Sequence, residues 1–285
     1  MELTFQLIIY GILMGLVFAL IALGLSLIFG VMNIVNFAHG EFLMVGMYIA
    51  YLISTFLHLD PLLSLPLAAI AGYMLGIMSY HFLIQHILRG PMVAQLFGTF
   101  GLMLFLRYLA MYIFTPDVRS IKQGLLVGKT LSFGWVNLDL SKVVSALLCM
   151  LSFGIVYWII YRTKLGRALR ATSIDAEAAQ YMGIDTKKMN SLAWGIGGAT
   201  VALAGSLLAH FYYITPTVGM LFTLIAFAIV ALGGFGSITG AFIAGIIIGL
   251  IMVVSGHFLS ELKFTFIYIV YFLVVVFRPR GFFGW

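Results

Sequence analysis

The sequence predicts an all-α protein, a polytopic transmembrane helical bundle of about 8–9 spans with a broken or re-entrant segment near residues 30–42. Two observations carry this prediction. The chain has 285 residues, of which 63% are hydrophobic and only 8% are charged, and its mean hydropathy is +1.16. Soluble domains carry roughly 25% charged residues, so this composition excludes an ordinary soluble protein. Several apolar runs also approach or exceed the about 20 residues that a helix needs to cross a bilayer.

Apolar runs separated by charged, proline-containing and polar clusters give nine expected spans. They are 5–29, 42–57, 62–85, 92–115, 142–161, 191–212, 220–234, 238–256 and 264–277. The runs 42–57 and 220–234 are short for a full crossing, so each is a candidate for a broken or re-entrant helix. The first run has no preceding basic segment, which favours a retained helix over a cleaved signal peptide. We expect a single transmembrane domain over 1–285.

The distribution of basic residues predicts the orientation. The longest polar connection, 162–190, holds six of them and is expected in the cytoplasm. Counting nine crossings from it places the C-terminus inside and the N-terminus outside, with Arg89, Arg278 and Arg280 also inside. Nine basic residues then lie inside and five outside. The net charge of +6 is therefore interpreted as a positive-inside bias and not as a nucleic-acid-binding surface.

Signals for an enzyme, a cofactor or a metal site are weak. The segment Gly124–Thr130, GLLVGKT, has three residues between its first glycine and Gly-Lys-Thr, where a P-loop has four. Ser206 and His210 share a helix face, but no acid in that helix would orient the histidine, so an interhelical hydrogen bond is favoured. His39 and Glu41 alone make a poor metal site. The single cysteine excludes an internal disulfide.

Glycine pairs mark places where helices are expected to touch. Four pairs have the GxxxG spacing: Gly11/Gly15, Gly72/Gly76, Gly236/Gly240 and Gly245/Gly249. Lipid provides no hydrophobic drive between helices, so close backbone approach supplies much of their association energy. Because the chain has 31 glycines, the same spacing also arises by chance, and both interpretations stay open.

The strongest polar cluster within the apolar part is FGVMNIVNFAHGEF, residues 29–42. On a helix, Asn33, Asn36 and His39 would form one stripe, and Glu41 follows directly. Such groups are costly against lipid, so they should face a cavity, a partner helix or the headgroups. They either line or gate a path where the first helix breaks, or tie two helix ends together in a hairpin.

Arg107 is the only basic residue well within an expected span. Its long apolar stem allows the guanidinium to reach the outer membrane surface, two to three helical turns away. It can also pair with an acid inside the bundle. We favour the first interpretation.

The cytoplasmic connection contains a short polar helix, TSIDAEAAQYMGID, of roughly ten residues. Thr172 and Asp175 have the spacing of a capping box, and Gly183 stands where a left-handed C-cap would end the helix. One face carries an apolar stripe formed by Ile174, Ala178, Tyr181 and Met182. This stripe cannot enter lipid without submerging the neighbouring acids, so it needs a protein groove on this chain or on a partner.

The sequence pattern Glu177-Ala178-Ala179-x-x-x-Gly183 in this loop resembles the coupling-loop motif of ABC importer permeases. Residues 24–48, GLSLIFGVMNIVNFAHGEFLMVGMY, resemble the N-terminal signature of branched-chain amino acid permeases of the LivH type. Residues 166–185, residues 230–245 and the C-terminal FRPRGFFG resemble further segments of that family, so the similarity spans nearly the whole chain. Thr239 and Met47 depart from it, since many relatives have proline and alanine there.

The resemblance implies a permease subunit of an ABC uptake system for branched-chain amino acids, multi-pass in the inner membrane. It implies a second related permease, two cytoplasmic ATPase subunits and an extracytoplasmic binding protein as partners, with ATP used by the partners and no cofactor on this chain. The implied ATPase-coupling residues are Glu177, Ala178, Ala179, Tyr181, Met182 and Gly183. The hypothesis for the path or gate names Asn33, Asn36, His39 and Glu41, and that for helix packing names Gly236, Gly240, Gly245 and Gly249.

Two alternatives stay open. Urea or short amides are the other substrates expected within the class, because related permeases share the AHGE core at residues 38–41. A different class is an ion-coupled secondary carrier, with His39, Glu41 and Arg107 as its relay. Such a carrier should have titratable residues in several spans, whereas here they cluster at one place.

Overall fold

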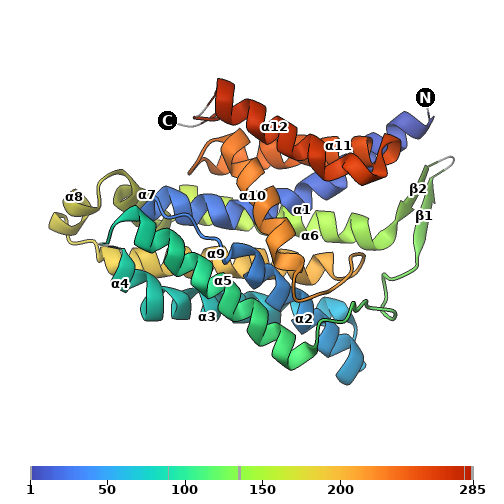
Figure 1. The fold of residues 1–285 in the computed structure, drawn as a ribbon, viewed down its shortest axis with the longest axis horizontal. Helices are drawn as coiled ribbons and strands as arrows, with labels where there is room; N and C mark the ends of the chain where they lie inside the picture. The colour runs from blue at the N-terminus through green and yellow to red at the C-terminus, as the bar shows by residue number, and fades with distance from the viewer. Residues whose placement is uncertain (1, 89, 134–135, 279, 284–285) are drawn as a thin grey trace.

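The computed structural model describes residues 2–88, 90–133, 136–278 and 280–283, and it is a helical bundle with one short β-hairpin (Figure 1). Its helices are α1 (Glu2–Met32), α2 (His39–Phe56), α3 (Ser64–Ser79), α4 (Gln85–Ile87), α5 (Met92–Phe114), α6 (Leu140–Arg162), α7 (Lys164–Ile174), α8 (Ala176–Tyr181), α9 (Thr186–Leu208), α10 (Val218–Gly233), α11 (Ile238–Phe258) and α12 (Lys263–Phe277). A π-helical turn, Tyr80–Ile84, joins α3 to α4, and 3-10 turns lie at Pro61–Leu63 and Ser260–Leu262. The hairpin consists of β1 (Thr130–Phe133) and β2 (Val136–Asp139).

Each of the nine expected spans coincides with a helix of the structure, which confirms the predicted fold class. Within the described residues, seven helical segments are long and apolar enough to cross a membrane. The two short runs correspond to α2 and α10, which do not belong to these seven. α2 follows a break in the helical chain after α1 and begins inside the bundle (Figure 1), so the broken segment expected near residues 30–42 is present.

The long helices run roughly parallel, and the bundle has two distinct ends (Figure 1). α7 and α8 lie at one end with the C-terminal end of α12, and the hairpin lies at the other end with the start of α1. Six basic residues of 162–190, together with Arg278 and Arg280, therefore gather at the α7–α8 end. Arg89, which was expected inside, and Pro279 and Gly284 of the C-terminal FRPRGFFG segment lie outside the described residues.

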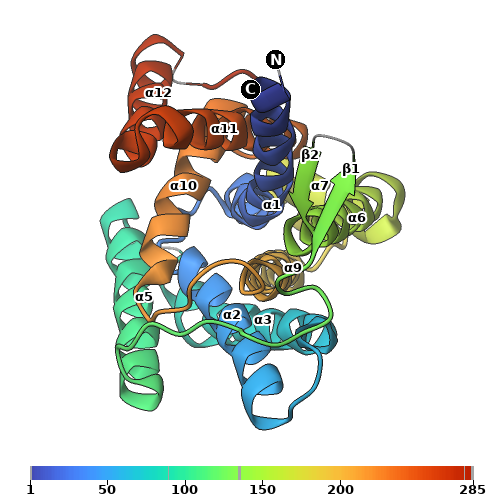
Figure 2. The ribbon, with the colours of Figure 1, turned by 90° about the vertical axis from the view of Figure 1, so that its right-hand side faces the viewer.

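The core of the bundle lies around α1 and α9. In each of these helices, 78% of the most apolar stretch of 18 consecutive residues is buried, against 22% in α5 and 6% in the segment that contains α12. α1 packs against α11, α9, α6 and α10, and α9 packs against α3 and α2. Viewed from the hairpin end, α5 lies at the edge of the molecule, and α11 and α12 form another edge (Figure 2).

Glycines lie where helices of this core come closest. On α1, added Cβ atoms at Gly11 and Gly15 would come within 2.9 Å and 2.6 Å of the Cα atoms of Leu250 and Ile246 on α11. From α11, a Cβ at Gly249 would lie 2.5 Å from the Gly15 Cα atom, and one at Gly245 would lie 2.8 Å from the Ala19 Cα atom. Two GxxxG pairs therefore face each other across one contact.

The other two glycine pairs also lie at backbone contacts. Cβ atoms at Gly72 and Gly76 of α3 would overlap backbone carbonyl groups of α9. Gly240 at the start of α11 faces Gly233 at the end of α10. Gly236 has φ +79°, and its added Cβ would lie 3.0 Å from the Cα atom of Gly30 on α1, so both conformation and space require a glycine there.

The hairpin is an element that the sequence analysis did not anticipate. β1 and β2 pair antiparallel with Thr130 opposite Asp139, and the Tyr10 hydroxyl of α1 donates to the Asn137 carbonyl at 3.0 Å. This hydrogen bond holds the hairpin against the start of α1. A second short pairing joins Arg119 to Ile214 through two backbone hydrogen bonds of 2.9 and 2.8 Å. α9 ends at Leu208, before this pairing and four residues before the expected boundary at residue 212.

The C-terminal segment closes the end of α10. The backbone N–H groups of Phe282 and Phe283 donate to the Leu232 and Gly233 carbonyls at 2.9 and 3.1 Å. The last carbonyls of a helix have no partner inside the helix, so this segment satisfies two of them. The C-terminal end of α10 is thereby fixed to the C-terminal segment of the chain.

The α1–α11 contact predicts a position-specific response to one added methyl group. Gly249→Ala should destabilise the protein by about 1–3 kcal/mol, because the new Cβ atom would overlap the α1 backbone. The measurement is the Tm of the purified chain in detergent. Gly154→Ala on α6 is the matched control, since nothing lies within 4 Å of its Cβ position. Equal Tm values for the two variants would contradict the packing argument.

Candidate functional site

The short helix α8 begins at a well-formed cap. The Asp175 side chain accepts hydrogen bonds from the backbone N–H groups of Glu177 and Ala178, both at 2.9 Å. Asp175 itself has extended backbone angles, which separate α8 from α7. The capping box expected from Thr172 is wrong, because Thr172 lies inside α7 and donates to the Ala168 carbonyl at 2.9 Å. The helix is six residues long, shorter than expected, because Asp175 caps it directly.

The other end of α8 is closed by Gly183. This residue has φ +84°, its N–H donates to the Gln180 carbonyl at 3.0 Å, and the Ile184 N–H donates to the Ala179 carbonyl at 3.0 Å. These two bonds form a Schellman motif, which satisfies the last carbonyls of a helix. Nothing lies within 4 Å of an added Cβ at Gly183, so its backbone angle, and not space, requires the glycine.

The two faces of α8 differ sharply in exposure. Ala179 is 5% exposed, and α8 packs against α7 and α9. The side chains of the expected apolar stripe are exposed, but they do not share one helix: Ile174, 85% exposed, ends α7, while Tyr181 ends α8 and Met182 follows it, each 84% exposed. Ala178 is exposed as well. This chain therefore does not supply the groove that the stripe needs.

α8 is attached to the bundle through α7. α7 packs against α6, α1 and α9, and its Leu169 side chain is 1% exposed. Added atoms at Gly166 would overlap the carbonyls at the end of α6, so α7 turns tightly away from that helix. α7 is thus braced against the core, while α8 protrudes at the end of the molecule (Figure 1).

The polar residues between α1 and α2 were expected to form a stripe on one helix, but the chain is not helical there. α1 ends at Met32, Asn33 has φ +54°, and residues 33–38 are not helical. Asn36 is fully buried, and its side-chain oxygen accepts from the Ala38 N–H at 3.0 Å. Asn33 is exposed, so these two residues do not share a face.

The start of α2 is packed against two other helices. The His39 Nε2 atom lies 2.8 Å from the Ile21 carbonyl oxygen of α1. The Gly40 N–H donates to Thr223 Oγ1 of α10 at 2.9 Å, and a Cβ at Gly40 would overlap the carbonyl of Gly219. The glycine at position 40 therefore lets the start of α2 contact the α10 backbone directly.

Glu41 forms an ion pair with Arg107. Its Oε1 atom accepts from Arg107 Nη2 at 2.6 Å, and the exposed fractions of the two side chains are 0% and 12%. The expectation that Arg107 reaches the membrane surface is therefore wrong. The acid that it meets lies 66 residues away, at the start of another helix, where no local pattern on α5 reveals it.

The four suggested path residues face different neighbours. His39 contacts α1, Glu41 contacts α5, Asn36 is buried in the non-helical segment and Asn33 is exposed. Arg107 joins this region, although the sequence placed it beside Glu41 only in the alternative of an ion-coupled carrier. The signal that could have found it was the presence of one acid and one base well inside the apolar segments, which favours mutual pairing in lipid.

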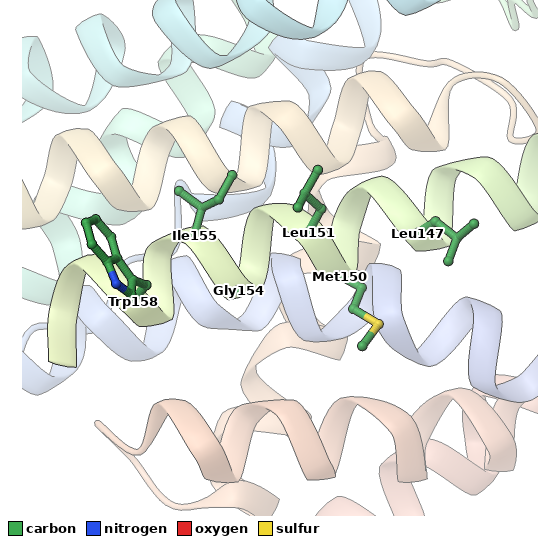
Figure 3. Close-up of a pocket in the computed structure, with 6 residues that line it drawn as sticks. All are labelled: Leu147, Met150, Leu151, Gly154, Ile155 and Trp158. Carbon is green, nitrogen blue, oxygen red and sulfur yellow. The ribbon is translucent and has the colours of Figure 1, made fainter. Parts of the chain in front are cut away.

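Other polar groups of the sequence analysis have structural partners. Ser206 Oγ lies 2.5 Å from Ser64 Oγ, so Ser206 makes an interhelical hydrogen bond as expected. His210 does not share its helix, because it lies in the turn after α9, where its ring contacts the Ser206 and Leu207 carbonyls. A hollow of about 660 Å³ lies on the outer face of α6 (Figure 3), and its lining contains no charged side chain. It is lined by Leu147, Met150, Leu151, Gly154, Ile155 and Trp158.

The caps of α8 predict that its stability depends on one carboxylate. Asp175→Ala should lower the local stability of α8 by about 1 kcal/mol, because two N–H groups lose their acceptor. Hydrogen–deuterium exchange of residues 176–184 should accelerate accordingly. Glu177→Ala is the control, since it removes an acid of the same helix that does not cap it. Equal protection in both variants would contradict this role of Asp175.

Comparisons with known proteins agree on one family. The sequence model of the family described as branched-chain amino acid transport system / permease component matches residues 7–277. The chain is 31% identical to the high-affinity branched-chain amino acid transport system permease protein LivH of Escherichia coli K12, covering 96% of this chain and 93% of that protein. It is 30% identical to the corresponding permease protein BraD of Pseudomonas aeruginosa, covering 98% and 95%.

Similarity extends to an archaeal protein and to a solved structure. The probable branched-chain amino acid transport permease protein LivH of Methanocaldococcus jannaschii is 34% identical, covering 81% of this chain and 74% of that protein. The solved structure of PsaBC from Streptococcus pneumoniae in complex with Fab contains a chain with a TM-score of 0.50 and 12% identity, covering 94% of this chain and 90% of that one. This last likeness concerns the fold alone.

Proposed function

This chain belongs to the family of branched-chain amino acid transport permeases, and we propose that it is a permease subunit of an ABC importer that moves leucine, isoleucine and valine-like substrates across the inner membrane. The structural observation that carries this proposal is α8. It is a short helix, capped at both ends and braced by α7, that presents an exposed apolar stripe at the end of a membrane bundle. A transporter driven by separate ATPases needs such a rigid contact point.

The stripe is suited to a protein groove. Ile174, Tyr181 and Met182 together expose three large apolar side chains beside the acids Asp175 and Glu177. Burial in lipid would submerge these acids, which costs several kcal/mol per charge. An amphipathic helix in this situation is typically bound in an apolar groove of a partner. We assign that groove to an ATPase subunit, with contacts through Glu177, Ala178, Ala179, Tyr181, Met182 and Gly183.

This assignment sets the orientation and the partners. The α7–α8 end faces the cytoplasm, with the C-terminus, and the hairpin end faces outward, with the N-terminus. The excess of basic residues at the α7–α8 end supports this orientation. A second related permease, two ATPase subunits and an extracytoplasmic substrate-binding protein complete the system. ATP is used by the ATPases, and this chain itself hydrolyses nothing and binds no cofactor.

The interrupted segment between α1 and α2 is assigned to the path or its gate. Its residues 33–38 lie outside any helix, and non-helical backbone at membrane depth is tolerated where it is buried in protein or lines a cavity. Asn33, Asn36, His39 and Glu41 remain the candidate residues. His39 contacts α1, Glu41 contacts α5 and the intervening Gly40 contacts α10, so a shift of those helices would change the segment.

A substitution on the exposed stripe tests the proposed role of α8. Tyr181→Asp should abolish co-purification of the ATPase subunits and leucine uptake by cells that carry the whole system, because it places a charge in the proposed groove. Tyr181 is 84% exposed, so membrane insertion and the Tm of the permease should stay unchanged. Val118→Asp is the matched control, since Val118 is 71% exposed in the connection between α5 and the hairpin.

The control should retain both ATPase binding and uptake. An inserted Tyr181→Asp variant that keeps its ATPases and transports leucine normally would contradict the role of α8. Absence of leucine, isoleucine and valine uptake by the wild-type system would contradict the proposed substrate class instead.

A further inference from the structure

The Glu41–Arg107 pair uses only part of its bonding capacity. One hydrogen bond joins the two groups, and among the described residues Glu41 Oε2 and Arg107 Nε, both buried, have no hydrogen-bond partner. The other contact of the guanidinium is a weak one, from Nη1 to the Met220 sulfur at 3.9 Å. Guanidinium and carboxylate can form two parallel hydrogen bonds, so a single bond leaves donors and an acceptor free for another ligand.

Such a pair is costly at this location. Both charges are removed from water inside a helical bundle, and replacement of a buried ion pair by apolar residues is often neutral or stabilising. Ionisable groups within membrane spans typically mark the route of a substrate or an ion. Stability alone therefore does not account for Glu41 and Arg107.

The two partners differ in how firmly they are held. Glu41 stands at the α2–α10 contact, where an added Cβ at Gly219 would lie 2.7 Å from the Gly40 carbonyl carbon and 2.9 Å from Glu41 Cδ. Arg107 comes from α5, the helix at the edge of the molecule (Figure 2). Its side chain is 12% exposed, and the adjoining Met220 is 49% exposed. The geometry places Glu41 on a rigid contact and Arg107 on a less embedded helix.

The helix α10, which meets both partners, is apolar apart from Thr223, whose hydroxyl accepts from the Gly40 N–H. Seven residues along the same helices from Arg107 and Met220, Phe100 of α5 and Phe227 of α10 pack against Phe37, with ring centroids 6.3 and 5.5 Å apart. Met220 and Leu224 lie on the exposed face of α10. One positive and one negative group within an apolar wall complement a zwitterion that carries an aliphatic side chain.

We propose that Glu41 and Arg107 form the binding site for the charged head of the amino acid on its way through the permease. Arg107 receives the α-carboxylate, and Glu41 receives the α-ammonium group. This inference rests on the proposed function and deepens it, because it assigns Arg107 to the path and states what the path recognises. Neutral solutes such as urea or amides lack both charges and would not separate the pair.

The exchange of partners keeps every buried charge compensated. Without substrate, each member of the pair neutralises the other, and with substrate, each neutralises one end of the zwitterion. A zwitterion entering an apolar path with no such groups would lose its hydration without replacement, which is strongly unfavourable. Separation of α5 from α2 and α10 opens the site, and closure restores the ion pair after the substrate has left.

The test removes both charges at once in the complete importer in liposomes, with leucine-saturated binding protein outside. The double variant Glu41→Gln/Arg107→Gln leaves no unpaired buried charge. We expect it to insert, to assemble and to keep ATP hydrolysis stimulated by the binding protein, while leucine uptake falls by roughly tenfold or more, which corresponds to about 1.4 kcal/mol. Lys122→Gln, at an exposed position outside the spans, is the matched control and should transport like the wild type.

Three outcomes would overturn the inference. Wild-type leucine uptake by the double variant would make the pair a structural tie only. Joint loss of uptake and stimulated ATP hydrolysis in an assembled complex would make it part of the gate or the coupling. If the double variant does not assemble, Arg107→Lys decides, because it keeps the charge but not the two-bond geometry, and unchanged uptake by that variant overturns the proposal.

The same experiment separates this inference from the proposed function. If the wild-type importer and the double variant take up leucine equally well, only the assignment of Glu41 and Arg107 as the binding site is contradicted. A wild-type importer that takes up none of the branched-chain amino acids contradicts the proposed function, and the site with it.

Discussion

Direct contact between helix backbones is the constraint on which the rest of this structure depends. At Gly40 an added Cβ would overlap the Gly219 carbonyl, and at Gly249 it would lie 2.5 Å from the Gly15 Cα atom. Between helices in lipid, such close approach replaces the hydrophobic drive that water provides for soluble proteins. The contact at Gly40 also fixes the next residue, Glu41, and so determines where the buried charge of α2 lies.

The spans of the fold follow from local composition, and the sequence therefore predicted them well. An apolar run must be helical in a membrane whatever its neighbours are, because its backbone groups have no other partners. The hairpin was missed for the opposite reason. β1 and β2 are four residues each, and they are held against α1 by the Tyr10 side chain, a tertiary contact that no periodicity reveals.

The candidate sites show the same division. The apolar stripe of α8 and the role of Gly183 depend on residues at most nine positions apart, and the sequence predicted that the stripe would need a groove. The placement of Asn33, Asn36 and His39 failed because a helical period was applied where the chain is not helical. The prediction that Arg107 reaches the membrane surface failed because it considered only the length of the side chain and the distance to the surface. The acid that binds Arg107, Glu41, comes from another helix.

Packing contacts link α8 to the region of the Glu41–Arg107 pair. α8 rests on α7 and α9, α7 packs against α1, and α1 ends where residues 33–38 leave the helical hydrogen-bond pattern. A helix resists bending along its bonded length, so a displacement that reaches the end of α1 is absorbed at this interruption. The contacts of Gly40 and Glu41 with α10 and α5 lie on its far side. On the proposed coupling role of α8, the interruption is the point at which a displacement of α8 would change the position of α1 relative to the charged pair.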